Sequence, residues 1–433
     1  MDNITTINTS QLKKTDYNGS VQNLYFLKEP DGYMVCETTS GGSVFDVGTI
    51  FSIEGSDISR AAIRHKIYSL LSDPVQWKAL CSELSNKPNT DKILLEYINS
   101  NLAKRFQSEG AKTHHIGLVD EYSGVVYQRG QFPEKLSKYV LVKRYNVIKP
   151  RLVKYMSNNL WDYSEYFNKD GSLIPLENIV RFGLTPSSSV LKKYLKMRDK
   201  EKSTFLLELG LSKELTAWER FNVPTVDFTT KYEPEDRNLS LQEALYITGF
   251  KGEQFFNIMN MAILGSLMVS RFFEEIGLFL WDIKWELAID NGELVFVDTI
   301  DTDSVRVTTQ IEYKGSQYHV HFNKQSMRDY YAIKHPDWYK AVNDTKAKAK
   351  DIGVSFTEIL KDGQIKGIYP ATPVVDKGFL EIQKAKQETI VSYIVGRISG
   401  EQTREKINKI GLEELEYYQR TGGLDKISAL NIR

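Results

Sequence analysis

The sequence predicts an α+β protein, and three observations support this fold class. Tyr17 to Thr38 contains two apolar runs around the turn sequence EPDG, which indicates a β-hairpin. Residues 278–306 predict a second hairpin, because apolar and polar side chains alternate there with the period of a strand. Residues 241–276 and much of the last third show helical spacing instead. With 433 residues, the chain is long enough for two or three domains.

The composition excludes several classes of protein. Because 56 basic and 56 acidic residues balance, the net charge provides no general attraction to nucleic acid or membranes, and the basic stretch 143–154 reads as a solvated surface. Cys36 and Cys81 are too few for a disulfide framework and are not spaced as a zinc site, which suits a reducing compartment. No signal-peptide core and no uncharged run of membrane-spanning length are visible. We therefore expect a cytoplasmic protein.

The N-terminal third is predicted to be rich in β-structure. Its first hairpin is followed by the loop SGGSVFDVG (40–48), whose glycines permit close approach of the backbone to a ligand. His114 and His115 are not expected to form a metal pair, since adjacent residues on a strand point to opposite faces. The other expected elements here are two helices, over 58–71 and 91–105, and two strands, over 113–120 and 124–128.

A strand over 139–148 is suited to joining two lobes, and residues 149–173 after it look like an irregular insertion. A strand over 174–181 then leads into a hydroxyl-rich loop and a helix over 190–200. Arg181 at the strand end, followed by serines at a helix start, makes a plausible phosphate seat. Serine-rich caps before helices are also routine, so this pattern alone is weak.

Residues 224–240 read as a polar, turn-rich segment that ends at Ser240, where Glu243 completes a capping box. The second of the helices that follow is apolar nearly all round over its middle, so we expect it to be the buried spine beneath the second hairpin. Beyond that hairpin, the expected elements are a β-segment to 322, helices from 324 and over 376–398, and a charged helical tail.

The second hairpin carries the strongest sign of chemistry. Its first strand has an apolar face and a polar face with Asp282, Lys284 and Glu286, and its second strand, 294–297, runs into several aspartates, among them Asp298. Like charges at such short distances repel each other, unless a divalent cation or a substrate phosphate lies between them. The hairpin therefore predicts a site for one of these.

The turn decides how these carboxylates face each other. A two-residue Asn-Gly loop places Asp298 opposite Trp285 on the buried side. A three-residue loop, with Gly292 left-handed in a bulge, places Asp298 beside Lys284 and one step from Glu286. We favour the three-residue loop, because an unpaired carboxylate buried against an indole ring is costly.

Six motifs in this order resemble the phosphoribosylaminoimidazole-succinocarboxamide synthase (SAICAR synthetase) family, to which the chain is similar as a divergent member. The match is patchwise and covers most of residues 19–329. The motifs are GSVQNLY (19–25), SVFD (43–46), PLENIVR (175–181), FTTK (228–231), DIKWE (282–286) and DTIDTDSVR (298–306).

The resemblance implies a two-lobed fold of the ATP-grasp or kinase-like type. A β-rich lobe (1–148) lies over an α+β lobe (149–320) with ATP in the cleft, and a helical region (321–433) follows. It implies an ATP-dependent carbon–nitrogen ligase of purine biosynthesis, which forms an acyl phosphate on a substrate carboxylate and lets an amine, aspartate in the family, displace phosphate. The cofactors implied are ATP and Mg²⁺. The partners implied are nucleotide and amino-acid substrates, without membrane or nucleic acid, and a homo-oligomer is allowed.

The resemblance also implies roles for individual residues. The metal ligands are Glu286 and Asp298; ATP is bound by Gly19, Lys231, Lys284 and Glu286; the substrates are bound by Ser43, Asp46, Arg181, Ser187, Asp303 and Arg306; and the catalytic residues are Asp46, Lys231 and Asp282.

Several positions depart from the family pattern. Ser20 and Gln22 stand where the family has lysines aimed at the ATP phosphates, and Thr299 follows Asp298 in place of an acid. Two alternatives therefore stay open. One is a ligase that joins another carboxylate to another amine, and the other is a non-catalytic protein that keeps the scaffold for binding or assembly.

Overall fold

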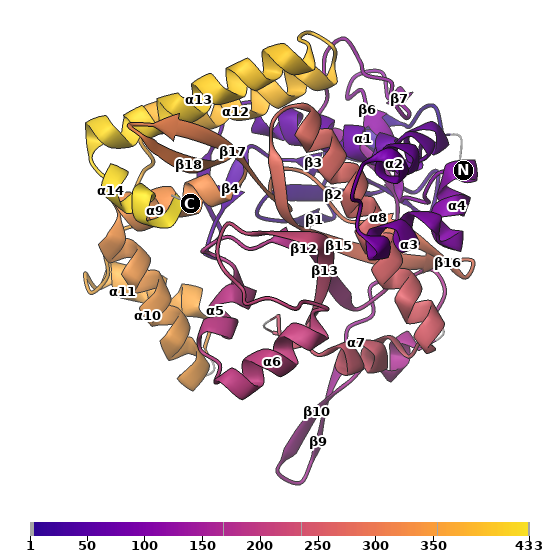
Figure 1. The fold of residues 1–433 in the computed structure, drawn as a ribbon, viewed down its shortest axis with the longest axis horizontal. Helices are drawn as coiled ribbons and strands as arrows, with labels where there is room; N and C mark the ends of the chain where they lie inside the picture. The colour runs from indigo at the N-terminus through magenta and orange to yellow at the C-terminus, as the bar shows by residue number, and fades with distance from the viewer. Residues whose placement is uncertain (1–3, 168, 235, 353, 432–433) are drawn as a thin grey trace.

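The computed structural model of the chain describes residues 4–167, 169–234, 236–352 and 354–431. Two β-sheets form the centres of two lobes, and helices cover both (Figure 1). The predicted two-lobed α+β fold is confirmed. The domain limits at 148 and 320 stay a prediction.

The N-terminal lobe is built on a six-stranded sheet with the order β1-β2-β3-β8-β6-β7. All of its neighbouring strands are antiparallel, and the predicted first hairpin is β2 and β3. Its strands are β1 (Tyr17–Asn18), β2 (Gln22–Phe26), β3 (Tyr33–Thr38), β6 (His115–Val119), β7 (Val126–Tyr127) and β8 (Tyr139–Lys143). A small separate hairpin, β4 (Gly41–Ser43) with β5 (Thr49–Ser52), carries the glycine-rich loop.

Helix α1 (Ser56–Ser72) packs against the inner face of this sheet, where Ala61 meets Cys36 and Val140. Cys36 and Cys81 are both free and buried. Three further helices follow on the chain: α2 (Pro74–Asn86), α3 (Lys92–Asn99) and α4 (Asn101–Glu109). The single helix predicted over 91–105 is wrong, because Ser100 interrupts it and its hydroxyl caps α4 by accepting from the Ala103 N–H.

The central lobe contains an eight-stranded sheet with β15 (Phe279–Asp290) at its middle. The path through the sheet is β14-β13-β12-β15-β17-β18, and β11 and β16 pair with the far end of β15. Its other strands are β11 (Ser172–Leu173), β12 (Leu176–Gly183), β13 (Arg220–Thr230), β14 (Asn238–Leu239), β16 (Glu293–Val297), β17 (Val305–Tyr313) and β18 (Ser316–His321).

Helix α8 (Gly252–Glu275) is the buried spine predicted beneath the second hairpin. Trp285 on β15 donates its indole N–H to the Ser266 hydroxyl of α8 at 2.8 Å. Gly265 permits this close packing, because a Cβ there would lie 2.6 Å from the Phe296 ring. The helix is long and apolar enough to cross a membrane, but 72% of its apolar window is buried inside the protein, as in an ordinary core helix.

Two predictions about this lobe need correction, and a third is confirmed. Residues 224–230, the first part of the segment 224–240 predicted to be turn-rich, belong to β13, because Val226 and Phe228 alternate with polar residues and bury one face of the strand. The helix predicted over 190–200 is two helices, α5 (Ser189–Leu195) and α6 (Asp199–Glu208). The predicted capping box is confirmed, since Ser240 and Glu243 bond reciprocally at the start of α7 (Leu241–Thr248).

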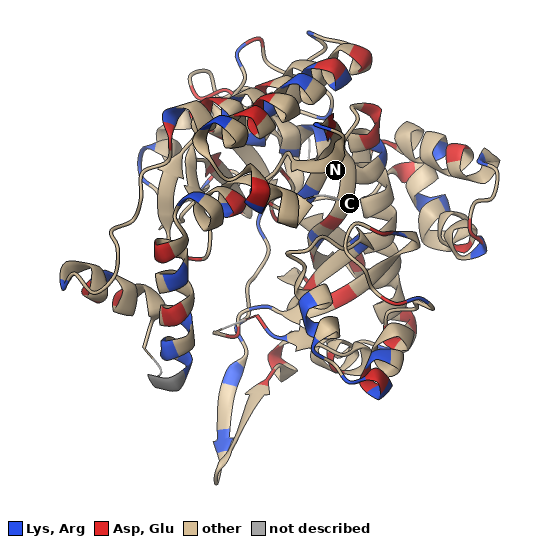
Figure 2. Ribbon diagram, turned by 60° about the vertical axis from the view of Figure 1, so that its left-hand side comes forward, with Lys and Arg blue, Asp and Glu red and all other residues tan. Residues whose placement is uncertain are grey.

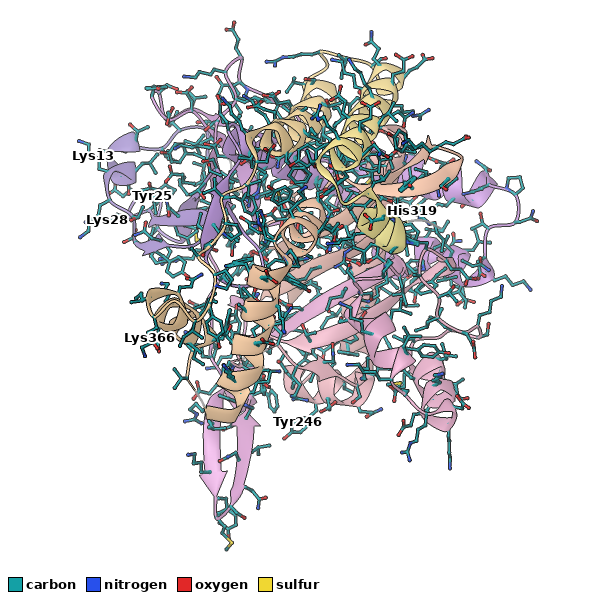
Figure 3. All side chains as sticks on the ribbon, turned by 90° about the vertical axis from the view of Figure 1, so that its left-hand side faces the viewer. Lys13, Tyr25, Lys28, Tyr246, His319 and Lys366 are labelled. Atoms are coloured by element: carbon teal, nitrogen blue, oxygen red, sulfur yellow. The ribbon has the colours of Figure 1, made fainter. Side chains whose placement is uncertain are left out.

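The insertion 149–173 is more regular than predicted. Strands β9 (Arg151–Tyr155) and β10 (Asn158–Asp162) form a hairpin that projects from the body of the protein (Figures 1 and 3). Most of its side chains are exposed.

The last part of the chain is helical, as predicted. In Figure 1, α12 and α13 lie together along one edge of the molecule, where α12 packs on α1 and α13 on β17. These helices therefore join the two lobes. Their bounds are α9 (Gln325–Lys334), α10 (Pro336–Ile352), α11 (Phe356–Ile365), α12 (Lys377–Ile394), α13 (Gly400–Thr421) and α14 (Leu424–Asn431).

Candidate active site

The charged side chains of the central lobe gather on the face of the sheet opposite α8. On β15, the residues that alternate with Trp281, Ile283 and Trp285 point to this face, and β12 and β13 add their own polar residues in register. Elsewhere acidic and basic residues are mixed along the helices, without a face of one sign in the view of Figure 2. Two ionic clusters result, one near each end of this face.

The first, which we name the lysine–carboxylate cluster, consists of Glu177, Lys231, Lys284, Glu286 and Asp298. The Lys284 ammonium lies 2.7 Å from Glu177, 3.0 Å from Glu286 and 3.8 Å from Asp298. The Lys231 ammonium lies 2.6 Å from Glu286 and 3.0 Å from Glu177. Three carboxylates thus share two lysines.

The environment of this cluster shifts the pKa values of its members. Burial, and then the neighbouring charge of Asp298, raise the pKa of Glu286. Burial alone would lower the pKa of Lys284, but Glu286, Asp298 and Glu177 raise it well above its usual range. Both lysines are therefore charged, and Glu286 ionises less readily than an ordinary glutamate.

Asp298 reaches this cluster by a route that differs from the predicted one. Asp290 pairs with Glu293 and Glu286 with Val297, so the turn is the two-residue Asn-Gly loop, and the favoured three-residue loop is wrong. In that register residue 298 faces the buried side. Asp298 instead leaves the strand with a φ of 68°, and this turn brings its carboxylate to Lys284 and Glu286. The predicted neighbourhood of Asp298 is confirmed.

The second, which we name the arginine–aspartate cluster, consists of Arg181, Asp227, Asp282 and Arg306. Arg181 binds Asp227 with two N–H groups, at 2.5 and 2.9 Å, and lies 3.7 Å from Asp282. Arg306 donates to Asp282 at 2.5 Å. Two arginines therefore balance two aspartates, and Arg181 is almost fully buried.

The predicted phosphate seat is only partly visible in this arrangement. Ser187 lies in the loop before α5, where its hydroxyl is 3.1 Å from that of Thr185. Among the contacts of the described residues, none joins Ser187 to Arg181, which pairs with Asp227 and Asp282. That the two converge on one anion stays a prediction.

The remaining aspartates of the hairpin have a structural explanation that the sequence analysis overlooked. Asp301 is fully buried against two arginines of α1, with Arg60 at 3.4 Å and Arg64 at 3.2 Å. Asp303 lies 3.4 Å from Arg60 and 4.0 Å from Lys324. The expectation that a metal or phosphate must separate all of these carboxylates is wrong for Asp301, because arginines neutralise it.

The SVFD loop lies under the C-terminal helices. Ser43 is buried at the end of β4, and the Phe45 ring packs against Tyr339 of α10. Asp46 is mostly exposed, with a φ of 62°, and forms an ion pair with Lys346 of α10 at 2.7 Å. The loop therefore depends on α10 for its position.

A cavity of about 420 Å³ separates the two sheets beside the lysine–carboxylate cluster. Much of its wall on the N-terminal side is apolar, although Arg64 and His114 also line it. The strand predicted over 139–148 ends at Lys143, and residues 144–147 line the cavity as a connecting segment. Glu286 and Asp298 lie at its polar end, together with Gln22 of β2. Gly19 is in the tight turn just before β2, where a Cβ would lie 2.7 Å from the Gln22 carbonyl oxygen. The apolar wall is formed by Leu24, Phe26, Met34, Cys36, Val142, Leu173 and Val297.

The donor set at the polar end suits a divalent cation that also binds phosphate. Glu286 and Asp298 supply hard oxygen ligands, which Mg²⁺ prefers. Within the described parts of the chain, no group of three or more His, Cys, Asp or Glu side chains is arranged to hold a metal. Two carboxylates fit an ion that takes its other ligands from a nucleotide and water.

Comparison with known proteins agrees with these observations. Residues 15–345 match the sequence model of a family described as SAICAR synthetase. The chain belongs to the SAICAR synthetase family.

Individual relatives of the family share a limited part of the sequence. The putative phosphoribosylaminoimidazole-succinocarboxamide synthase of Archaeoglobus fulgidus is 29% identical over 246 residues, which are 57% of this chain and 67% of that protein. The Thermoplasma volcanium synthase is 28% identical over 227 residues, or 52% and 64% of the two chains. The SAICAR synthase of Saccharomyces cerevisiae, complexed with SAICAR, has a TM-score of 0.49 at 17% identity, and covers 91% of this chain and 98% of its own. A SAICAR synthetase in complex with ADP has a TM-score of 0.40 at 16% identity, and covers 82% and 99%.

Membership of the SAICAR synthetase family makes this chain an enzyme of the ligase type.

Sequence reasoning missed several residues of its site. Glu177 lies four residues before Arg181, and Asp227 four residues before Lys231, so a period of two places each pair on one face of its strand. The sequence therefore contained a signal for Glu177 and Asp227. Tyr68 and the His114 ring, whose pKa burial lowers to about 3, contact the backbone of the acidic hairpin. No local pattern indicates these contacts.

Proposed function

We propose that the protein is an ATP-dependent amide ligase that joins the carboxylated aminoimidazole ribotide to aspartate. The observation that carries this proposal is the cavity between the lobes, which has one apolar wall and ends at two carboxylates beside two lysines. Arg64, Lys143 and Arg144 line it as well. A purine ring fits the apolar part, and its phosphates then reach the charged end. This placement is supported by family membership and by the ADP named in the complex of a related enzyme.

The reaction forms and breaks two bonds in sequence. A carboxylate oxygen of the ribotide attacks the γ-phosphorus of ATP and ADP leaves, which produces an acyl phosphate. The amine of the amino acid then attacks the acyl carbon, phosphate leaves, and the nitrogen loses a proton to become an amide. Magnesium, when bound, neutralises charge on the phosphates.

The residues of the lysine–carboxylate cluster bind the nucleotide in this proposal. Glu286 and Asp298 hold the divalent ion, and Lys231 and Lys284 offer their ammonium groups to phosphoryl oxygens as point charges. Gly19 lets the backbone before β2 approach the phosphates closely, because no side chain fills that turn.

The arginine–aspartate cluster and the loops around it bind the ribotide. Arg306 and Ser187 face its phosphate, and Arg181 keeps Asp282 in place while its unused N–H groups remain for substrate. We assign Ser43, Asp46 and Asp303 to the ribotide as well, with Asp46 orienting the carboxylate that is activated. Lys346, which now pairs with Asp46, must then release it.

Calorimetric titration of ATP with magnesium into the purified protein tests the nucleotide site directly. Incubation with ATP, magnesium and the ribotide, with and without aspartate, tests the reaction. Phosphate release that requires aspartate supports the proposal. Phosphate release with another amine points to a different ligase, and a folded protein that binds no ATP at millimolar concentration contradicts both.

A further inference from the structure

The backbone at Asp298 decides where one carboxylate of the proposed metal site points. The register of β15 and β16 would place residue 298 on the side of the sheet that faces α8. The positive φ of Asp298 reverses this direction, and this left-handed conformation is unfavourable for a residue with a Cβ. Such a conformation persists only where surrounding groups hold it.

Two side chains from the N-terminal lobe hold this peptide. The Tyr68 hydroxyl of α1 lies 2.8 Å from the Val297 carbonyl oxygen and 2.7 Å from that of Asp298. The His114 Nε2 lies 3.1 Å from the same Asp298 carbonyl oxygen. Tyr68 has one hydroxyl proton, which the two carbonyl groups share, and the neutral His114 ring donates through Nε2–H.

Tyr68 is itself fixed by its neighbours. Its side chain is fully buried, and its ring stacks on His115 at 5.2 Å between centroids, with an angle of 11° between the planes. His115 in turn hydrogen-bonds His65 of α1 at 2.8 Å. The donor at the Asp298 carbonyl therefore has little freedom to move.

We propose that Tyr68 and His114 are positioning residues of the nucleotide site, which hold Asp298 in its left-handed conformation and so aim its carboxylate at Glu286 and Lys284. This inference rests on the proposed function, in which Glu286 and Asp298 hold the divalent ion that accompanies ATP. Tyr68 does not line the cavity, whereas the His114 ring does. They act through the backbone of Asp298.

A purely structural role is the alternative, because the same hydrogen bonds fasten α1 to the hairpin. The two roles predict different effects of Tyr68→Phe, which keeps the ring and removes the hydroxyl. A positioning role lowers the gain in ATP affinity that magnesium confers, by about tenfold, as expected when a residue behind a metal ligand is changed. It leaves the affinity measured in EDTA unchanged.

The experiment is a calorimetric titration of ATP, with magnesium and with EDTA, into the wild type and Tyr68→Phe. Tyr331→Phe is the matched control, since it also removes a buried hydroxyl that donates to a backbone carbonyl, that of Ile50. This control should keep the full magnesium gain. His114→Gln, which retains an N–H donor, should keep the gain as well, and His114→Leu should lose it.

A double-mutant comparison completes the test. In an Asp298→Asn background the carboxylate is already absent, so adding Tyr68→Phe should change the magnesium gain no further. The inference is overturned if Tyr68→Phe keeps the full gain, if it weakens binding equally in EDTA, or if its effect persists in Asp298→Asn. A wild type that binds no ATP with magnesium overturns the proposed function and the inference with it. A wild type with a normal gain and an unaffected Tyr68→Phe overturns the inference alone.

Discussion

The two ionic clusters on the polar face of the central sheet differ in their balance of charge. In the arginine–aspartate cluster, two arginines meet two aspartates, and Arg181 binds Asp227 with two parallel N–H groups. In the lysine–carboxylate cluster, three carboxylates share two lysines, whose side chains remain 24% and 31% exposed. In the first cluster the charges are matched in number and paired directly. The second cluster keeps a surplus of negative charge beside a cavity.

This difference suits the two clusters to different roles, structural support for the arginine–aspartate cluster and ligand binding for the lysine–carboxylate cluster. Changing one partner of a planar, bidentate pair lowers the free energy of unfolding strongly, because the other partner is left as an unpaired buried charge. A cluster with surplus carboxylate can accept a cation, and the lysines can then turn toward phosphate oxygens. We therefore expect changes in the lysine–carboxylate cluster to affect ligand binding and changes in the arginine–aspartate cluster to affect stability as well.

The largest effect is expected for Glu286→Gln. It removes one of the two carboxylates that face the cavity and should lower the magnesium-dependent gain in ATP affinity by about 100-fold, the upper range for changes around a bound metal. Calorimetry with and without magnesium measures this gain. Glu312→Gln, at an exposed position of β17, is the control and should change nothing. Unchanged ATP affinity in Glu286→Gln would show that the metal assignment is wrong.

Arg181→Lys tests the other cluster. Lysine keeps the charge but cannot form both bonds to Asp227, so the free energy of unfolding and the ribotide affinity should each fall by ~1–3 kcal/mol. Arg306→Lys should cost less, about 1 kcal/mol, because Arg306 contacts Asp282 through one nitrogen. Denaturant unfolding and ribotide titration measure the two quantities. Equal losses of unfolding free energy in Arg181→Lys and Arg306→Lys would contradict the stated difference between a two-bond and a one-bond contact.

Acidification should act on the lysine–carboxylate cluster in a defined direction. Burial and Asp298 raise the pKa of Glu286 above its usual value of 4.5, so protons compete with a divalent ion at a higher pH than for an ordinary glutamate. The magnesium gain, measured at constant MgATP concentration, should shrink as pH falls through this raised pKa. Without metal, the stability from Glu286 is fully present below 4.5 and is lost as pH rises through the raised pKa. In Asp298→Asn, the pH at which Glu286 titrates should move down, and a profile that stays in place would refute this coupling.

The smallest effect is expected for Thr229→Val. Its hydroxyl donates to Glu177 at 3.0 Å, while both lysines still hold that carboxylate, so the loss of unfolding free energy should be ~0.5–1.5 kcal/mol. Thr225 is the control on the same strand and face, because its buried hydroxyl has no partner among the described residues. Thr225→Val should cost less than Thr229→Val in denaturant unfolding, and the reverse order would contradict the assigned contacts.

The local pattern of the sequence was sufficient for the elements that carry the site. The alternation over 278–289 predicts β15 with Asp282, Lys284 and Glu286 on one face, and the apolar run of α8 predicts the helix beneath it. The same alternation in 220–230 was overlooked, because the polar residues that follow it resemble a turn. The breaks at Ser100 and between α5 and α6 were also missed, since helix ends depend on single caps.

By itself, the sequence determined which chemistry the second hairpin carries, because the types and spacing of its charged residues decide which of them share a strand face. The tertiary structure alone decided which carboxylates are available. Asp301 is neutralised by Arg60 and Arg64, which lie 241 and 237 residues away along the chain, and the Asp298 carbonyl oxygen accepts a hydrogen bond from Tyr68 of α1. A period-of-two pattern follows from the geometry of one strand. Contacts between distant segments form only when the lobes pack, and no local pattern records them.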